Sequence, residues 1–194
     1  TEGLLLLTND GNLSHQLMHP SFEIEKRYWA KVKGIPTEEQ IKKVAQGGLT
    51  LSQERTTGPA RATGHEKAVG LEKSAPCKIR LLTQKKAQSA LRGQRPLRGQ
   101  ISQPGQAALA GHVAPRETEN PWLEIILHEG KKREVRRLME KIGHPVLKLK
   151  RVGFANLTLG AVPTGAYRLL TPKEIEGLQK LLVRGEERRR TRNP

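Results

Sequence analysis

The sequence predicts an α+β fold for this chain of 194 residues. Segments in which apolar and polar residues alternate, as in half-buried strands, are interspersed with segments of helical periodicity. The links between them are short and rich in turn-forming residues, which is typical of antiparallel neighbours. The length is sufficient for one compact domain with a hydrophobic core, or for two small lobes.

The first ordered region covers residues 1–62 and begins with an apolar run. Leu4–Thr8 reads as a short buried strand, and Asn9-Asp10-Gly11 supplies turn-forming residues. Asp10 or Asn12 can cap a helix that His19-Pro20 ends, because a residue before proline avoids the helical conformation. Asp10 is therefore interpreted as a turn former rather than as a catalytic acid.

A strand and a second helix follow in this region. Arg27–Val32 alternates between polar and apolar residues, which predicts a strand. Thr37 with Gln40 three positions later matches a capping box, so a helix should begin there. Gly47-Gly48 should end it.

The region from 119 to 183 predicts further strands and two helices. The helices are expected at Arg133–Ile142, with Gly143 at its C-terminal end, and at Pro172–Val183. The expected strands are Trp122–His128, Val146–Lys150, Leu157–Leu159 and Tyr167–Leu170. Residues 184–194 are almost entirely basic, and we expect a frayed tail.

Between these regions, residues 63–118 differ in composition. Ser74 to Arg116 contains no acidic residue but eight lysines and arginines among Gly, Gln, Ser, Ala and Pro. Such a segment buries too little apolar surface to offset its ordering entropy. We expect one domain over residues 1–183, carrying a flexible basic insertion at about 63–118 in which Lys78–Leu82 is the one strand-like piece.

The charge of the chain points to a polyanionic partner. The formal net charge is +16 and the isoelectric point is about 10.4, which favours RNA or DNA over a solvated surface without a partner. No apolar stretch approaches the roughly 20 residues of a membrane-spanning helix. The single cysteine, Cys77, fits a reducing cytosol. The start at Thr1, within a few residues of an apolar run, suggests a truncated or processed start.

The strongest local signal lies between His128 and Met139. A glycine-led turn feeds a helix with five cations within seven residues: Lys131, Lys132, Arg133, Arg136 and Arg137. Clustered like charges are costly unless an anion meets them, although an ordinary basic helix face remains the alternative.

This segment resembles the third motif of the RsuA-like ribosomal RNA pseudouridine synthases, which reads approximately E-G-(K/R)-x-(R/H)-Q-V-(R/K)-R-M. Other blocks follow in the family's order: Thr1–Gly11, His19-Pro20, Lys26-Arg27-Tyr28-Trp29, Val32-Lys33-Gly34, Gly58-Pro59-Ala60, Gly143–Val146, Leu149–Gly153 and Gly165–Leu169. Gly34–Glu38 after Tyr28-Trp29 is most similar to the E-type subgroup acting on large-subunit RNA. Glu134 stands where the motif has glutamine.

The resemblance implies a mixed, mostly antiparallel sheet with helices around a central RNA-binding cleft. It places the nucleophilic aspartate three residues before Thr1, outside this sequence. Tyr28 matches the tyrosine that stacks on the target base, and Arg136 matches the basic residue that pairs with the aspartate. Leu149 matches the aliphatic residue against the other face of the base, although plain core packing is the alternative. The basic residues expected to bind RNA are Lys131, Lys132, Arg133, Arg137 and Arg151.

The implied function is isomerisation of uridine to pseudouridine in ribosomal RNA, most similar to the large-subunit (23S) enzymes. The expected protein is a cytoplasmic monomer without cofactor or membrane association, and the chain as given should be inactive. A non-catalytic RNA-binding or ribosome-assembly module is the alternative. His15 and His19 have a spacing that zinc ligands can have, but no third ligand accompanies them, so no metal is expected. No glycine pattern indicates a nucleotide site.

Overall fold

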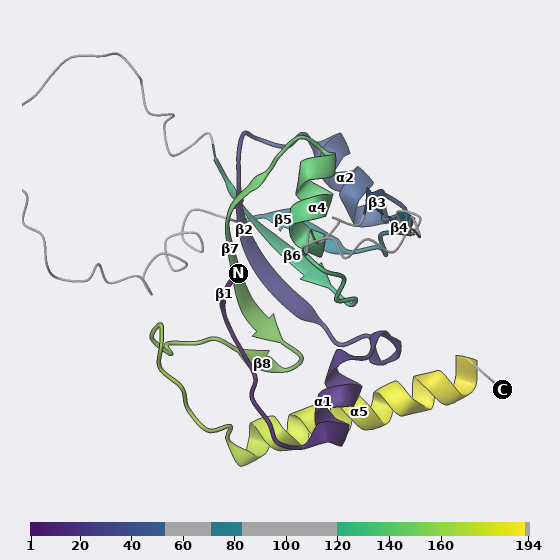
Figure 1. Cartoon of the computed structure of the whole chain (residues 1–194), viewed down its shortest axis with the longest axis vertical. Helices are drawn as coiled ribbons and strands as arrows, with labels where there is room; N and C mark the ends of the chain where they lie inside the picture. Colours follow the sequence, from purple (N-terminus) through teal and green to yellow (C-terminus); the bar gives the residue numbers. More distant parts are fainter. Residues whose placement is uncertain (53–70, 83–119, 193–194) are drawn as a thin grey trace, which may run out of the picture.

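The computed structural model describes residues 1–52, 71–82 and 120–192. Its centre is a six-stranded, mostly antiparallel sheet in the order β1-β7-β2-β6-β5, with β8 paired to β7 (Figure 1). The strands are β1 (Glu2–Gly3), β2 (Lys26–Val32), β5 (Lys78–Leu81), β6 (Trp122–Leu127), β7 (Val146–Phe154) and β8 (Leu157–Thr158). Only the β1–β7 pair is parallel among the described strands. The α+β class predicted from the sequence is confirmed.

Helices α2 (Glu38–Gln46) and α4 (Glu134–Lys141) accompany the β2, β6 and β7 part of the sheet (Figure 1). A hydrophobic core joins them, because Val44 of α2 and Leu138 of α4 are fully buried together with Ala30, Leu123 and other strand residues. The α2 helix begins at the predicted capping box: Thr37 Oγ1 accepts from the Gln40 N–H, and the Gln40 side chain accepts from the Thr37 N–H.

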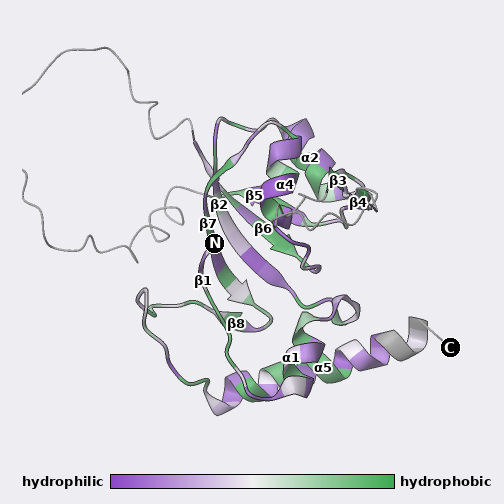
Figure 2. Ribbon diagram, in the orientation of Figure 1, coloured by the Kyte–Doolittle hydropathy of each residue, from purple (hydrophilic) through white to green (hydrophobic). Residues whose placement is uncertain are grey.

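A second core lies at the other end of the molecule. Helix α1 (Gly11–Met18), the single 3-10 turn η1 (Pro20–Phe22) and helix α5 (Pro172–Arg192) meet there (Figure 1). Leu17, Phe22, Phe154, Leu178 and Leu182 are buried in it. Figure 2 shows hydrophobic and hydrophilic residues mixed along α5, as expected for a helix with one buried side.

The first helix follows the prediction closely. Asp10 is its N-cap, and its carboxylate accepts from the Leu13 N–H at 3.0 Å. The helix ends at His19, before Pro20. The predicted strand at Leu4–Thr8 is wrong, because strand pairing stops at Gly3. After one more bond, from the Leu4 N–H to the Arg151 carbonyl at 2.9 Å, the chain leaves β7 so that Leu4 can pack on the second core.

Part of the predicted flexible insertion forms strands. Residues 71–82 contain β4 (Leu71–Lys73), which pairs with β3 (Thr50–Ser52) as a separate two-stranded sheet, and β5, which extends the main sheet beside β6. Buried Cys77 and half-buried Ile79 attach this piece to the first core. A strand forms at Lys78–Leu81 as expected, and the strand at Leu71–Lys73 was not expected; the flexibility of the insertion stays a prediction. The remaining parts, 63–70 and 83–118, lie outside the described residues.

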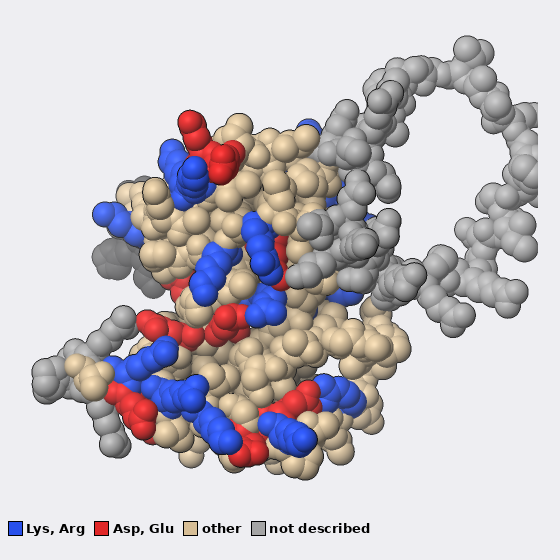
Figure 3. Space-filling model, turned by 180° about the vertical axis from the view of Figure 1, so that it is seen from behind, with Lys and Arg blue, Asp and Glu red and all other residues tan. Residues whose placement is uncertain are grey.

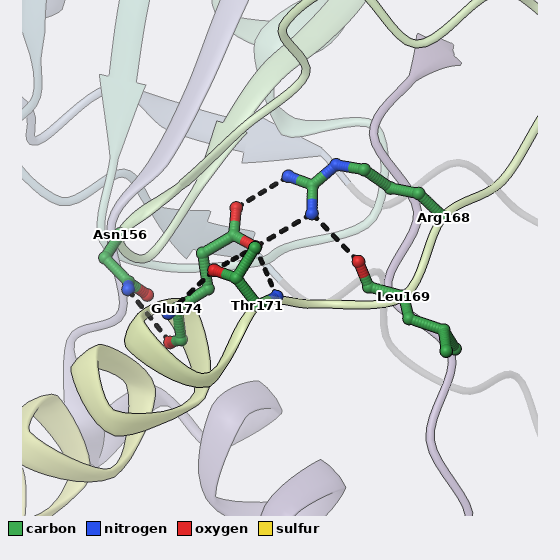
Figure 4. Close-up of polar contacts among 5 residues, drawn as sticks. All are labelled: Asn156, Arg168, Leu169, Thr171 and Glu174. Atoms are coloured by element: carbon green, nitrogen blue, oxygen red, sulfur yellow. Dashed lines mark hydrogen bonds and ion pairs between the residues drawn. The ribbon is translucent and has the colours of Figure 1, made fainter.

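The predicted strand at Tyr167–Leu170 is also wrong. Tyr167 and Leu169 are 90 % and 87 % exposed, and no described strand pairs with this stretch. Arg168 fixes the segment instead: its two terminal nitrogens donate to the two Glu174 carboxylate oxygens at 2.8 and 2.6 Å. The same carboxylate accepts from the Thr171 N–H at 2.8 Å, which caps α5 (Figure 4).

The expected frayed tail from residue 184 is helical to Arg192, so that expectation is wrong over this range. The physical reason is docking of the helix onto the N-terminal elements. Gly185 lies so close to Phe22 that a Cβ would contact its ring at 2.8 Å. Glu186 accepts from the Gln16 amide at 2.9 Å. Residues 193–194 lie outside the described part of the chain.

Candidate active site

The pairing of β2 with β7 brings three of the predicted site residues onto one face of the sheet. Tyr28 lies opposite Arg151, and Ala30 lies opposite Leu149. Directly paired residues of antiparallel strands point to the same side, and residues two apart on one strand do as well. Tyr28, Leu149 and Arg151 therefore share a face, which is the face that carries the first core.

The three residues differ in exposure. Leu149 is only 9 % exposed and belongs to the first core. Tyr28 is half-buried and packs against the same core. Arg151 is also half-buried; its Nε donates to the Leu4 carbonyl at 2.7 Å, and its guanidinium lies 5.4 Å from the centre of the Phe154 ring. The tyrosine thus lies beside a fixed cation at the edge of the core.

Arg136 approaches the same strands from α4. The residue before the helix, Arg133, has a left-handed backbone with φ of 54°, which turns the chain sharply into the helix. One turn later, the half-buried Arg136 donates from Nη1 to the Val146 carbonyl at 3.1 Å, at the start of β7. The guanidinium is therefore anchored at the end of the strand that carries Leu149.

The five cations of the turn and helix have different environments. Lys132 and Arg133 are exposed. Lys131 forms an ion pair with Glu129 at 2.8 Å and also donates to the Lys73 carbonyl, so its charge is largely satisfied within the chain. Arg137 is 8 % exposed and lies 3.6 Å from a carboxylate oxygen of Glu72. This depth suits Arg137 to packing between α4 and β4 rather than to an external phosphate.

Three ionisable residues beside the site were not predicted as functional. Lys26 is 8 % exposed, and burial lowers the pKa of its ammonium group, partly opposed by Glu134. Burial together with a hydrogen bond to Glu129 raises the pKa of Glu134 to about 8. Lys26 could have been found from its position two residues before Tyr28 on an alternating strand. Glu129 and Glu134 lie five positions apart in the His128–Met139 segment, but the burial that raises the pKa of Glu134 could not be read from the sequence.

Positive charge also gathers on the outside of the molecule. Figure 3 shows lysine and arginine side chains in the middle of the rear face and along the rim formed by α5, with acidic side chains between them. Among the described residues, no three His, Cys, Asp or Glu side chains are grouped as a metal site would require. Within the same residues no helix has the length and apolar character needed to cross a membrane.

Comparison with known sequences gives consistent matches. The profile of a family described as RNA pseudouridylate synthase matches residues 1–141. A Bacillus subtilis protein named ribosomal large subunit pseudouridine synthase B is 36 % identical over 187 residues, covering 96 % of this chain and 56 % of the relative. A Xanthomonas campestris protein named ribosomal large subunit pseudouridine synthase E is 30 % identical over 170 residues, covering 87 % and 71 %.

A crystal structure described as a pseudouridylate synthase has a similar fold, with a TM-score of 0.56 and 21 % identity over 88 % of this chain and 52 % of that one. The chain spans about half the length of several curated relatives that it matches, with 56, 52 and 50 % of their lengths covered.

Proposed function

Because this chain belongs to the RNA pseudouridylate synthase family, we propose that it is the catalytic part of an enzyme that isomerises uridine to pseudouridine in ribosomal RNA. The observation that carries the proposal is the shared face of β2 and β7, which holds Tyr28 beside Arg151 and next to Leu149. The names of the B- and E-type relatives support large-subunit RNA as the substrate.

The reaction breaks the N1–C1′ bond of a uridine, turns the uracil and forms a C5–C1′ bond, while C5 loses a proton and N1 gains one. The enzyme must therefore hold the freed ring and move a proton at C5. It must also take the base out of its stack, which costs a few kcal/mol. No atom enters or leaves overall, so no redox partner is required.

Tyr28 is proposed to contact the target base. Its ring packs at the edge of the first core, and we propose that a base stacks on it while its hydroxyl takes part in proton transfer at C5. Leu149 is proposed to support the other side of the ring. Its burial means that the base must come deep over the β2–β7 face to make this contact, and that Leu149 also serves the core.

Arg136 is proposed to pair with the nucleophilic aspartate of a longer protein. Glu2 lies opposite Lys150, and parallel strands advance together along the ladder. If that register continues upstream, an aspartate three residues before Thr1 lies opposite Val146, whose carbonyl accepts from Arg136. A guanidinium there would keep the carboxyl group ionised.

Exposed Lys132 and Arg133 are proposed to contact RNA phosphates beside this site. Lys131 and Arg137 would act on RNA only indirectly, because intrachain carboxylates already engage them. Arg151, held by the Leu4 carbonyl, would face the substrate only at the edge of the site. We propose that the enzyme acts as a monomer in the cytoplasm, without a metal or cofactor.

A tritium-release assay tests this function. Large-subunit ribosomal RNA labelled at C5 of uridine is incubated with the 194-residue chain and with a version extended upstream to include the aspartate. The extended protein should release tritium, whereas the shorter chain should bind the RNA without release. Turnover by the shorter chain would contradict the assignment of the nucleophile. Binding without turnover by both would leave a non-catalytic RNA-binding module.

A further inference from the structure

Two carboxyl groups meet below the turn that leads into α4. Glu134 is the first residue of the helix and is 3 % exposed. Its Oε2 accepts from the Lys131 N–H at 3.2 Å. Its Oε1 is fully buried and accepts no hydrogen bond in the described part of the chain. A buried oxygen that accepts no hydrogen bond destabilises the folded chain, and it does so more strongly if the group is ionised.

Glu129, by contrast, is fully used as an acceptor. Its Oε1 accepts from the Ala75 N–H at 2.7 Å, and its Oε2 lies 2.8 Å from Lys131 Nζ. Both carboxyl groups converge on Lys131, whose N–H donates to Glu134 and whose Nζ pairs with Glu129, and the pKa values of both glutamates respond to a hydrogen bond between them. Two ionised carboxylates cannot form such a bond, because each is an acceptor only. A proton on Glu134 Oε1 provides the missing donor.

Two cations lie beside the carboxyl pair, but burial lowers the pKa of Lys26, and both cations are also engaged elsewhere. Lys26 from β2 and Lys131 from the turn face the pair, and Arg151 from β7 acts on Lys26. The remaining titratable neighbour, Cys77 beside β5, is buried and its thiol pKa is raised to about 11, so it stays neutral. Both cations already have other contacts, since Lys26 donates to the Ile24 carbonyl and Lys131 to the Lys73 carbonyl.

We propose that Glu134 and Glu129 share one proton, donated from Glu134 to Glu129, and that this proton holds the turn before α4 against the Lys73–Ala75 segment. The attachment is direct. The same Glu129 carboxylate that accepts the proton also accepts from the Ala75 N–H and binds Lys131, which in turn reaches Lys73. Loss of the proton places the buried charge of Glu134 beside the half-buried charge of Glu129 and weakens this attachment.

The pKa values agree with this geometry. Burial, and then the bond to Glu129, raise the pKa of Glu134 to about 8. Burial acts to raise the pKa of Glu129 as well, but hydrogen bonds from Glu134, Lys131 and Ala75 outweigh it and lower that pKa. Glutamine, which the RsuA-like motif has at position 134, offers a permanent donor at the same place. In this chain the donor is instead the protonated carboxyl group of Glu134, which loses its proton at alkaline pH.

The proton also affects RNA binding, in so far as the proposed function holds. The turn carries Lys132 and Arg133, and their positions depend on its attachment to the body of the protein. We therefore expect the affinity of this chain for RNA to fall at alkaline pH. In Glu134→Gln, the affinity should no longer depend on the titration of residue 134.

Carbon NMR of the glutamate-labelled chain tests the shared proton directly. The Glu134 carboxyl signal should titrate with a midpoint near 8. The Ala75 amide proton signal should shift with the same midpoint in the wild type and stay constant in Glu134→Gln. Glu140→Gln, at an exposed position of the same helix, should behave as the wild type. Titration of both Glu129 and Glu134 near the ordinary value of 4.5 would overturn the proposal.

A second arm separates this inference from the proposed function. The affinity for a large-subunit RNA fragment is measured across the same pH range for the wild type and Glu134→Gln. The wild type should lose affinity several-fold more than the variant above the midpoint. Equal losses of affinity in the wild type and in Glu134→Gln would overturn the proposed effect on RNA binding. The NMR titration of the Glu134 carboxyl group would still decide whether the proton is shared. Failure of both proteins to bind RNA would count against the proposed function alone.

Discussion

Tyr28 and Arg151 lie directly opposite each other on β2 and β7, and Val152 is an extra residue of β7 beside this pair, because Arg27 lies opposite Gly153. Tyr28 faces the first core together with Ala30. The half-buried ring therefore has a fixed cation at its side. This relationship leads to the first prediction.

Tyr28→Phe should preserve the fold and RNA affinity of the full-length enzyme but lower its single-turnover rate. The ring remains for stacking, while the hydroxyl that moves the proton is lost, and such groups contribute about 10²–10⁴-fold. The rate is measured by tritium release under single-turnover conditions. Tyr167→Phe, at a tyrosine that is 90 % exposed, is the matched control and should leave the rate unchanged. An unchanged single-turnover rate in Tyr28→Phe would mean that the hydroxyl of Tyr28 has no role in proton transfer.

Arg136→Met should reduce the single-turnover rate of the full-length enzyme far more than its RNA affinity. Methionine keeps much of the side-chain volume, but the charge that would ionise the nucleophile is lost, together with the bond to Val146. Lys132→Ala should show the opposite pattern, with lower affinity and a salt dependence flatter by about one unit of slope. Purely affinity-type losses in both variants would make Arg136 another phosphate contact.

The stability of the chain should depend on pH through Glu134. Its pKa is about 8 in the folded chain and 4.5 ordinarily, so between these values the folded chain holds a proton that the unfolded chain has released. The stabilisation is complete below the lower value and is lost as the pH rises to the upper one. The free energy of unfolding should therefore fall with rising pH, at most by about 1.4 kcal/mol per unit from this group.

Urea unfolding at a series of pH values measures this effect as the difference between the wild type and Glu134→Gln. The difference should change steadily across the window and level off at both ends. Glu140→Gln should follow the wild type, because that side chain is exposed on the same helix. A constant difference would mean that Glu134 is ionised throughout.

Gly3→Ala should destabilise the chain by about 1–3 kcal/mol, the usual range for a strained backbone position. Gly3 has φ of 102°, and an added Cβ would collide with the Arg151 carbonyl oxygen, breaking the parallel pairing of β1 with β7. Thermal or urea unfolding provides the measurement. Gly11→Ala is the control, because no atom lies within 4 Å of a Cβ there, and it should not destabilise. Equal stability of the two variants would show that β1 contributes little.

The sequence predicted those features whose cause is local. The Thr37–Gln40 capping box and the Asp10 cap are bonds between residues three apart, and both form as predicted. The strand β7 extends to Phe154, beyond the predicted end at Lys150, because pairing with β2 and β8 continues it. Tyr167–Leu170 has the alternation of a strand but no sheet partner in the described part of the chain.

The candidate site could be predicted only as far as the family motif reaches. Tyr28, Leu149 and Arg151 meet through the β2–β7 register, and the motif marks all three. The environments of the cations could not be predicted. Whether a lysine such as Lys131 is engaged by Glu129, or exposed like Lys132, depends on how the turn packs against residues more than fifty positions away.

The second core joins the two ends of the chain. Gln16 of α1 and Glu186 of α5, 170 positions apart, bond at 2.9 Å, and Phe22 contacts the same helix at Gly185. Contacts between such distant segments require closing a long loop and are slow to form. During synthesis, α1 therefore lacks its contacts with α5 until α5 has left the ribosome. The first core, by contrast, can assemble once β7 has emerged, so the chain should mature in two steps.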